Sequence, residues 1–200
     1  MRMINYPTGS KPNHHHTKKT EHTHNTIYGS RGMSLEDKIN QSNEYYLTHH
    51  LAVIHKKPTP VQVVKVDYPR RSAAKIVEAY YRHASTTDYN GVYQGFYIDF
   101  EAKETKNKTS FPLANLPEHQ RTHMLQCIEQ GGIAFLILSF AAHNETYIIP
   151  YEKVDREIKK SKKQSLTYDF IKQEGFLCKE GLFPIIDYLA ALDQYIESRE

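Results

Sequence analysis

Residues 86–104 read TTDYNGVYQGFYIDFEAKE, and this stretch contains the pattern that decides the fold. Aromatic and β-branched residues precede Glu101, which predicts a strand of a sheet. Two turn-forming pairs, Asn-Gly and Gln-Gly, lie between Asp88 and Glu101, so the chain can double back on itself. We therefore expect a hairpin that brings Asp88 close to Glu101. Lys103 is expected on the same face as Glu101, because side chains alternate along a strand.

The residue types in this set point to a metal site. Two carboxylates beside a lysine form an oxygen-lined site for Mg²⁺ with one fixed positive charge at its edge. Such a site suits hydrolysis of a phosphodiester, in which the lysine stabilises the developing negative charge. The alternative is a solvated surface strand, on which Glu and Lys two residues apart are common. The face of Glu101 and Lys103 also carries Asp99, and a buried sheet does not tolerate three charges without a ligand, which favours the metal site.

Length and charge predict one main domain with a basic extension. The chain has 200 residues and a net charge of +3, and residues 1–31 carry five Lys or Arg against one Glu, a balance of +4 that leaves the remainder near −1. We expect a flexible basic tail over 1–30 and a nuclease domain over 31–200. The tail is either a phosphate-seeking arm or a solubilising one. Five histidines in it can bind Zn²⁺ or Ni²⁺ adventitiously, without a dedicated site.

The cysteine and hydropathy patterns predict a cytoplasmic protein. Cys127 and Cys178 are the only cysteines, show no metal-binding spacing and follow no secretory signal, so reduced thiols are expected. The most apolar stretch, residues 132–142, is shorter than the roughly 20 residues that a bilayer span needs. We expect it to be a buried strand, and we expect no membrane association.

Periodicity and capping signals predict alternating helices and strands. Ser34 begins a helix to about His50, with an acid three residues later as in a capping box. Glu36 in its first turn is either an acid favoured by the helix dipole or a carboxylate that reaches toward the metal. The other expected elements are strands at 51–55, 61–66, 133–140 and 146–150 and helices at 72–83, 117–130, 151–163, 165–173 and 184–197. The lysine-rich helix 151–163 is either a DNA edge or a solvated face.

Residues 56–60 read KKPTP and interrupt the strands around them. Two prolines beside two lysines do not fit a central strand, so they predict an exposed, stiff, cationic projection, a stalk over about 56–70. Between Lys56 and Arg82, seven positive charges face two negative ones. This balance favours a surface that contacts phosphate.

Three stretches closely resemble the RecU family of Holliday junction resolvases from Gram-positive bacteria: residues 52–62, 85–91 and 98–113. The resemblance runs from about Gly32 to Pro150, is weaker from Tyr151 to Glu200 and is slight in the first thirty residues. It implies an α/β fold of the restriction-endonuclease-like, PD-(D/E)xK type, with a mixed central sheet flanked by helices and a projecting stalk. It also implies a homodimer with one Mg²⁺-dependent site per subunit, in which Mn²⁺ can substitute.

The resemblance further implies roles for individual positions. It identifies four metal-holding residues: Thr86, Asp88, Glu101 and Gln120. Lys103 corresponds to the transition-state stabiliser and completes a catalytic set with Asp88 and Glu101, and the stalk is expected to enter the centre of the junction. The cations expected to contact DNA are Lys56, Lys57, Arg70, Arg71, Lys106 and Lys108.

The expected function is a structure-selective endonuclease that resolves four-way DNA junctions by paired nicking, in homologous recombination and DNA repair. The expected partners are branched DNA, a second copy of the chain, and recombinase and branch-migration proteins, in the cytoplasm at the nucleoid. Two alternatives stay open: an accessory protein that binds and anneals DNA or modulates the recombinase without chemistry, and a nuclease of the same fold that cuts duplex DNA. The set of Asp88, Glu101 and Lys103 favours catalysis, and the stalk favours a branched substrate.

Overall fold

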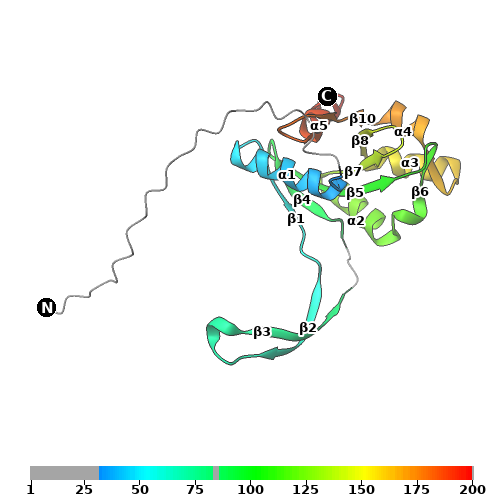
Figure 1. Ribbon diagram of the computed structural model, residues 1–200. Helices are drawn as coiled ribbons and strands as arrows, with labels where there is room; N and C mark the ends of the chain where they lie inside the picture. The colour runs from blue at the N-terminus through cyan, green and yellow to red at the C-terminus, as the bar shows by residue number, and fades with distance from the viewer. Residues whose placement is uncertain (1–31, 83–85, 200) are drawn as a thin grey trace, which may run out of the picture.

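The computed structural model describes residues 32–82 and 86–199, and its centre is a six-stranded mixed sheet with helices on both faces (Figure 1). The strand order is β1-β4-β5-β7-β8-β10. These strands are β1 (Val53–Lys56), β4 (Tyr89–Tyr93), β5 (Phe96–Thr105), β7 (Ile133–Phe140), β8 (Glu145–Pro150) and β10 (Phe176–Leu177). The α-helices are α1 (Leu35–Thr48), α2 (Glu118–Glu129), α3 (Tyr151–Ser161), α4 (Tyr168–Glu174) and α5 (Tyr188–Glu197). The predicted α/β class, a mixed sheet flanked by helices, is confirmed.

Smaller elements complete the chain. Three two-stranded sheets pair β2 with β3, β6 with β9, and β11 with β12. Their bounds are β2 (Val61–Asp67), β3 (Lys75–Tyr81), β6 (Ser110–Pro112), β9 (Ser165–Thr167), β11 (Lys179–Glu180) and β12 (Ile186–Asp187). Two short 3₁₀ helices are η1 (Arg71–Ala73) and η2 (Leu113–Asn115).

The hairpin predicted between Asp88 and Glu101 is present as β4 and β5, which pair antiparallel from Tyr89 with Phe100 to Tyr93 with Phe96. Its turn is Gln94-Gly95, where both residues have positive φ, 49° and 81°, as a two-residue hairpin turn requires. The Asn90-Gly91 pair lies inside β4 and makes no turn. Gly91 is needed there for another reason, because a Cβ at this position would lie 2.1 Å from the carbonyl oxygen of Val53 in β1.

β5 and β7 are parallel neighbours joined by a crossover that contains α2, whereas the other neighbouring strands of the large sheet pair antiparallel. A crossover helix between parallel strands runs back along the sheet in the opposite direction. The first turn of α2 therefore lies toward the carboxyl end of β5. This placement brings the polar face of β5 against α2.

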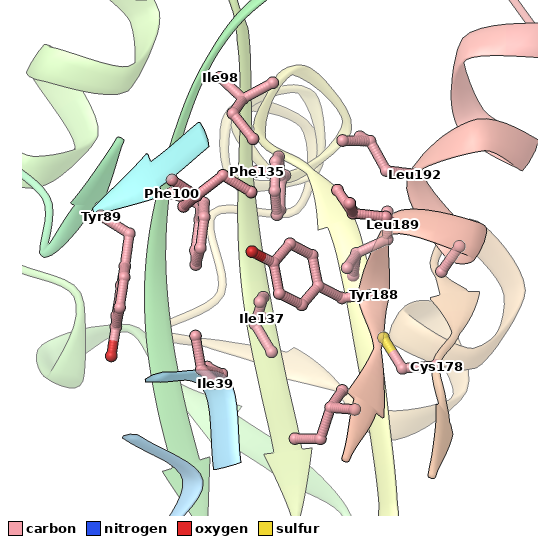
Figure 2. Packing of buried hydrophobic residues seen from close by; sticks show 14 of the residues in the cluster. Ile39, Tyr89, Ile98, Phe100, Phe135, Ile137, Cys178, Tyr188, Leu189 and Leu192 are labelled. Atoms are coloured by element: carbon pink, nitrogen blue, oxygen red, sulfur yellow. The ribbon is translucent and has the colours of Figure 1, made fainter. Parts of the chain in front are cut away.

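Different helices cover the two faces of the large sheet. On one face, Phe100 and Phe135 pack with α1 and α5, and Figure 2 shows them around Tyr188 of α5. Phe100 stacks between Tyr89 and Phe135, with ring centroids 4.8 Å apart on each side. On the other face, Leu136 and its neighbours pack with α2 and α3. The sheet is therefore an inner layer, buried on both sides along β5 and β7.

β5 carries charged residues into this buried layer. Ile98 and Phe100 point to the face of α1 and α5, so Asp99 and Glu101 lie on the face of α2. Both carboxylates are fully buried, at 0% exposure. A buried ionised carboxylate costs several kcal/mol unless it is paired or holds a cation, so this face must supply partners.

β2 and β3 form an antiparallel hairpin that projects away from the body (Figure 1). Almost all of its residues are exposed on both faces. The helix expected at 72–83 is wrong, because β3 occupies Lys75–Tyr81 after the short η1. The segment reads KIVEAYY, whose β-branched and aromatic residues favour a strand once β2 offers a pairing edge. The projection therefore extends to Tyr81, beyond the stalk expected at 56–70.

The other boundaries agree with expectation or differ by a few residues. The Oγ of Ser34 accepts a hydrogen bond of 3.1 Å from the N–H of Asp37 and caps α1, as the sequence predicted. The helices expected at 165–173 and 184–197 begin at Tyr168 and Tyr188, because short strands, β9 and β12, precede them. Within residues 32–82 and 86–199, no helix combines the length and apolar character of a bilayer span. The predicted tail over 1–30, with its histidines, lies outside the described residues.

Candidate active site

Asp88 and Glu101 lie side by side across the β4–β5 hairpin. The backbone N–H of Asp88 donates a hydrogen bond of 2.9 Å to Oε2 of Glu101. The Nζ of Lys103 lies 2.7 Å from the other carboxylate oxygen, Oε1. The hairpin and the alternation of β5 thus bring together the three residues predicted as the catalytic set.

The buried position of Glu101 perturbs its ionisation. Burial raises the pKa of Glu101 to about 7, and the Asp88 carboxylate adds to the rise, while Lys103 opposes it. The Glu101 side chain is fully buried, whereas that of Lys103 is 26% exposed. A carboxylate whose charged form is destabilised in this way gains most from a nearby cation.

Gln120 presents an unused oxygen to the same face. It lies in the first turn of α2, as predicted, and is buried. Its Oε1 accepts no hydrogen bond from the described residues, and Oε1 of Glu101 has its ion contact with Lys103 but no partner in hydrogen-bond geometry. One turn later on α2, His123 contacts Asp99 of β5. Because α2 runs antiparallel to β5, Gln120 lies toward Glu101.

These donors fit a hard divalent cation. A buried oxygen without a partner is uncommon, and that of Gln120 indicates a missing ligand. The half-buried Thr86, two residues before Asp88, adds a hydroxyl that donates to the carbonyl of Thr87 at 3.4 Å. Carboxylate, amide and hydroxyl oxygens are the ligands that Mg²⁺ and Mn²⁺ prefer. The four residues named by the sequence resemblance therefore have the right chemistry for such an ion.

Asp99 is the centre of a buried polar network that the sequence-based site did not include. Its Oδ2 accepts hydrogen bonds from Nζ of Lys57 at 2.8 Å and from the hydroxyl of Tyr97 at 2.9 Å. The same oxygen lies 3.2 Å from Nε2 of His123, and the Thr87 hydroxyl donates to Oδ1. Although burial opposes ionisation, hydrogen bonds from Lys57 and Thr87 hold the pKa of Asp99 below its ordinary value. Strand alternation was the available signal, since Asp99 shares a face with Glu101.

Lys57 ties the base of the stalk to the active site. Its backbone N–H donates to the carbonyl of Asp88 at 2.7 Å, and its ammonium also donates to Oγ1 of Thr87 at 3.0 Å. Lys57 was expected to contact DNA, but its ammonium is engaged with the buried Asp99. Lys56 is likewise paired, with Glu36 of α1. The structure therefore assigns both lysines ion pairs that a local sequence pattern does not reveal.

A cleft of about 680 Å³ opens at the base of the stalk and reaches Asp88. It is lined by Glu36, Lys56, Lys57, Pro58, Thr59, Pro60, Arg82, Thr86, Thr87 and Asp88. The cleft connects the cationic residues of the stalk base to Asp88 at the start of the hairpin. A nucleic-acid backbone that entered it would pass next to the oxygen-rich site.

The remaining cations predicted to contact DNA lie at two other places. Arg70 is exposed at the far end of the β2–β3 hairpin, and Arg71 follows it in η1. Lys106 and Lys108 are exposed in the loop after β5. None of the ion pairs among the described residues involves Arg70, Lys106 or Lys108.

The chain is similar to the members of one known protein family. A family model described as "Recombination protein U", RecU, matches residues 30–194. The chain is 55% identical over 201 residues to a Holliday junction resolvase RecU of Leuconostoc citreum, with 98% of both chains covered. It is 52% identical over 201 residues to a Holliday junction resolvase RecU of Staphylococcus aureus, with 96% of both covered.

One similar solved structure is that of Hjc, a Holliday junction resolvase from Archaeoglobus fulgidus. The match has 8% sequence identity and a TM-score of 0.40, and it covers 68% of this chain and 93% of that one.

Proposed function

The chain belongs to the RecU family, and from this premise we propose that it is an endonuclease that resolves four-way DNA junctions in recombination and repair. The observation that carries the proposal is the buried Glu101 carboxylate, which lies beside Asp88 and Lys103 on the sheet face that α2 covers, and α2 carries the unpartnered oxygen of Gln120. A purely DNA-binding protein has no use for such a set, because burying it costs stability. A metal-dependent phosphodiesterase requires it.

Four residues are proposed to hold one divalent ion, Mg²⁺ with Mn²⁺ as a substitute: Thr86, Asp88, Glu101 and Gln120. When bound, the ion supplies Lewis-acid polarisation of the scissile phosphate and makes water a better nucleophile. Glu101 must be deprotonated to bind the ion. Because the pKa of Glu101 is raised to about 7, this deprotonation depends on pH near neutrality. The N–H of Asp88 orients Glu101 by donating to Oε2, which leaves Oε1 beside the Lys103 ammonium.

Lys103 is proposed to stabilise the transition state. Its ammonium lies beside the buried Glu101, and its side chain is 26% exposed, so a phosphate bound next to Glu101 is within its reach. As the phosphorus becomes five-coordinate, negative charge grows on its non-bridging oxygens. A positioned ammonium at the edge of a buried site stabilises that charge more than water does.

The stalk is proposed to select branched DNA. The β2–β3 hairpin exposes Tyr68, Tyr80 and Tyr81, at 71%, 61% and 84% exposure, on an element with both faces in solvent. Aromatic rings stack on exposed base faces, and the central base pairs of an open four-way junction present such faces, whereas the interior of a duplex does not. Arg70, Arg71, Lys106 and Lys108 are proposed to contact phosphates on either side of that centre.

A homodimer is proposed as the active form. The two-fold symmetry of a pair of identical subunits matches the pseudo-two-fold symmetry of a junction and accounts for paired nicks. A chromosomal substrate places this activity at the nucleoid, where recombinase and branch-migration proteins are the proposed partners.

A cleavage assay tests the function. A labelled four-way junction and a duplex of the same sequence are incubated with the protein and Mg²⁺, and the reaction is repeated with EDTA. We expect symmetrically placed nicks in the junction alone, and only with the ion. Binding without nicks in Mg²⁺ or Mn²⁺ would instead favour the accessory role, and equal cutting of both substrates would favour a duplex nuclease.

A further inference from the structure

A second cluster of metal-binding side chains lies beside the active site but has a different composition. Oδ2 of Asp99, Nε2 of His123 and Sγ of Cys127 all lie within 4.8 Å of one another. β5 supplies Asp99, and α2 supplies the other two from positions i and i+4, which share one helix face. Asp99 is fully buried, and His123 and Cys127 are half-buried.

The orientation of His123 excludes a proton relay. In a relay of the Cys-His-Asp kind, the thiol and the carboxylate bind opposite nitrogens of the ring. Here the same nitrogen, Nε2, faces both groups, at 3.2 Å from Asp99 and 3.6 Å from Cys127. Three different donor atoms therefore converge on one point, which is the arrangement of a metal site.

The two separations from Nε2 of His123 agree with a zinc ion. A tetrahedral zinc ion, with bonds of about 2.0 Å to nitrogen and oxygen and about 2.3 Å to sulfur, sets its ligand atoms about 3.3 Å (N···O) and about 3.6 Å (N···S) apart. The observed separations are 3.2 Å and 3.6 Å. Thiolate and imidazole select Zn²⁺ over the hard ions Mg²⁺ and Ca²⁺.

We propose that Asp99, His123 and Cys127 form a zinc site, separate from the oxygen-lined site at Glu101. The fourth position opens toward a cavity of about 390 Å³. The cavity is lined by Tyr97, His123, Gln126, Cys127, Gln130 and Gly132. A water molecule from this cavity completes the tetrahedron.

Zinc binding at this site releases one proton. Cys127 releases its thiol proton to solvent, and His123 binds as a neutral imidazole through Nε2. The ion then carries two positive charges against the two negative charges of Asp99 and the thiolate. The ammonium of Lys57 stays as a hydrogen-bond partner of Asp99, so the set including Lys57 carries one net positive charge, and such an outer partner orients the carboxylate.

The zinc site would brace the two elements that carry the proposed catalytic ligands. Glu101 lies two residues after Asp99 on β5, and Gln120 lies one turn before His123 on α2. A bound ion joins these elements by strong bonds at the point next to the active site. The inference does not depend on the proposed nuclease function, since it rests on these three donor atoms alone.

Cobalt(II) provides the test, because a thiolate bound to Co²⁺ gives an intense ultraviolet charge-transfer band and a tetrahedral site gives strong visible bands. The full-length protein is titrated with Co²⁺, and we expect both bands to saturate at one ion per chain. Cys127→Ser should abolish the thiolate band, whereas Cys178→Ser, which removes the other thiol, should keep it. Histidines in residues 1–31 can bind cobalt but cannot produce a thiolate band.

Two further measurements separate this site from the other. Zn²⁺ at one equivalent should remove the cobalt bands, while a hundredfold excess of Mg²⁺ should leave them unchanged, and Glu101→Gln should keep them. His123→Gln retains the thiol and should weaken cobalt binding at least tenfold, which gives a second reading if Cys127→Ser is unstable. The proposal is overturned by a wild-type protein without the thiolate band, by a band that survives Cys127→Ser, or by displacement with Mg²⁺.

Discussion

The backbone N–H of Asp88 donates to Oε2 of Glu101 across the β4–β5 hairpin, at 2.9 Å, and this bond links the two proposed metal ligands. It occupies one carboxylate oxygen and leaves the other, Oε1, beside Lys103. The two acids are 13 positions apart in the chain, and the two-residue turn at Gln94-Gly95 makes them neighbours. The geometry leads to five predictions.

Asp88→Asn should separate binding from cleavage. Asparagine has the size of aspartate and keeps the backbone hydrogen bond from residue 88 to Glu101. It removes one negative charge from the groups that hold the ion. We expect junction affinity to stay within about threefold and the cleavage rate to fall about a thousandfold, a loss of about 4 kcal/mol in transition-state stabilisation. Gel-shift and single-turnover cleavage assays measure the two effects, with the exposed Asp169→Asn as control. Near-normal cleavage by Asp88→Asn would remove this residue from the metal site.

Lys103→Met should lower the cleavage rate about 100- to 1,000-fold while the ion still binds, because the ammonium acts on the transition state and is no ligand. Lys103 also lowers the pKa of Glu101, so its removal should move the pH–rate profile toward higher pH. Single-turnover rates across pH 6 to 9 test both effects. A rate loss with an unmoved profile would mean that Lys103 does not influence Glu101.

Glu101 should make the metal-free protein less stable as pH rises. Its pKa is about 7 in the folded protein against 4.5 for the unperturbed group, so the folded state holds the proton more tightly. Stability is therefore lost as pH rises from about 4.5 to about 7. Between pH 5 and pH 8 we expect the free energy of unfolding to fall by about 2 to 3 kcal/mol more in the wild type than in Glu101→Gln. Urea unfolding in EDTA measures this difference, and Mg²⁺ should reduce it.

Replacing Lys57 should lower the free energy of unfolding much more than replacing its neighbour Lys56. Lys57→Met leaves the buried Asp99 without its ammonium and should lower the free energy of unfolding by about 3 kcal/mol. Lys56→Met breaks an exposed pair with Glu36 and should cost about 1 kcal/mol or less. Urea unfolding of both variants at pH 7 gives the comparison. Equal losses would show that the Lys57–Asp99 pair contributes no more than a surface pair.

Lys106 and Lys108 should contribute to DNA affinity through phosphate alone. Each released phosphate counterion adds about 0.9 to the slope of log affinity against log salt concentration. We expect Lys106→Ala/Lys108→Ala to reduce that slope by about 1 to 2, with an equal loss for junction and duplex. Fluorescence anisotropy at several salt concentrations tests this, and Lys179→Ala, at an exposed lysine outside the predicted contact set, should leave the slope unchanged. An unaltered slope in the double variant would show that Lys106 and Lys108 do not contact DNA phosphates.

The class of fold and the position of the candidate site could be predicted from the sequence. Alternation along β5 and the hairpin turn are local properties, so the shared face of Glu101 and Lys103 and the closeness of Asp88 followed from short-range pattern alone. The capped start of α1 and the placement of Gln120 in the first turn of α2 are local for the same reason. Interactions between residues close in the chain depend little on the rest of the molecule.

Features that depend on contacts between residues far apart in the sequence could not be predicted from local pattern. The segment Lys75–Tyr81 becomes a strand because β2 pairs with it, and Lys57 turns inward because Asp99 lies buried across the sheet from it. The meeting of Asp99 with His123 and Cys127 requires α2 to cross back over β5, which no spacing in the chain reveals. Helices, strands and turns follow largely from neighbouring residues. The partner of a buried charge is decided by packing among segments that are far apart in sequence. Because burial removes the charge from water, an unpaired buried charge costs several kcal/mol of folding free energy, and this cost decides which partner it has.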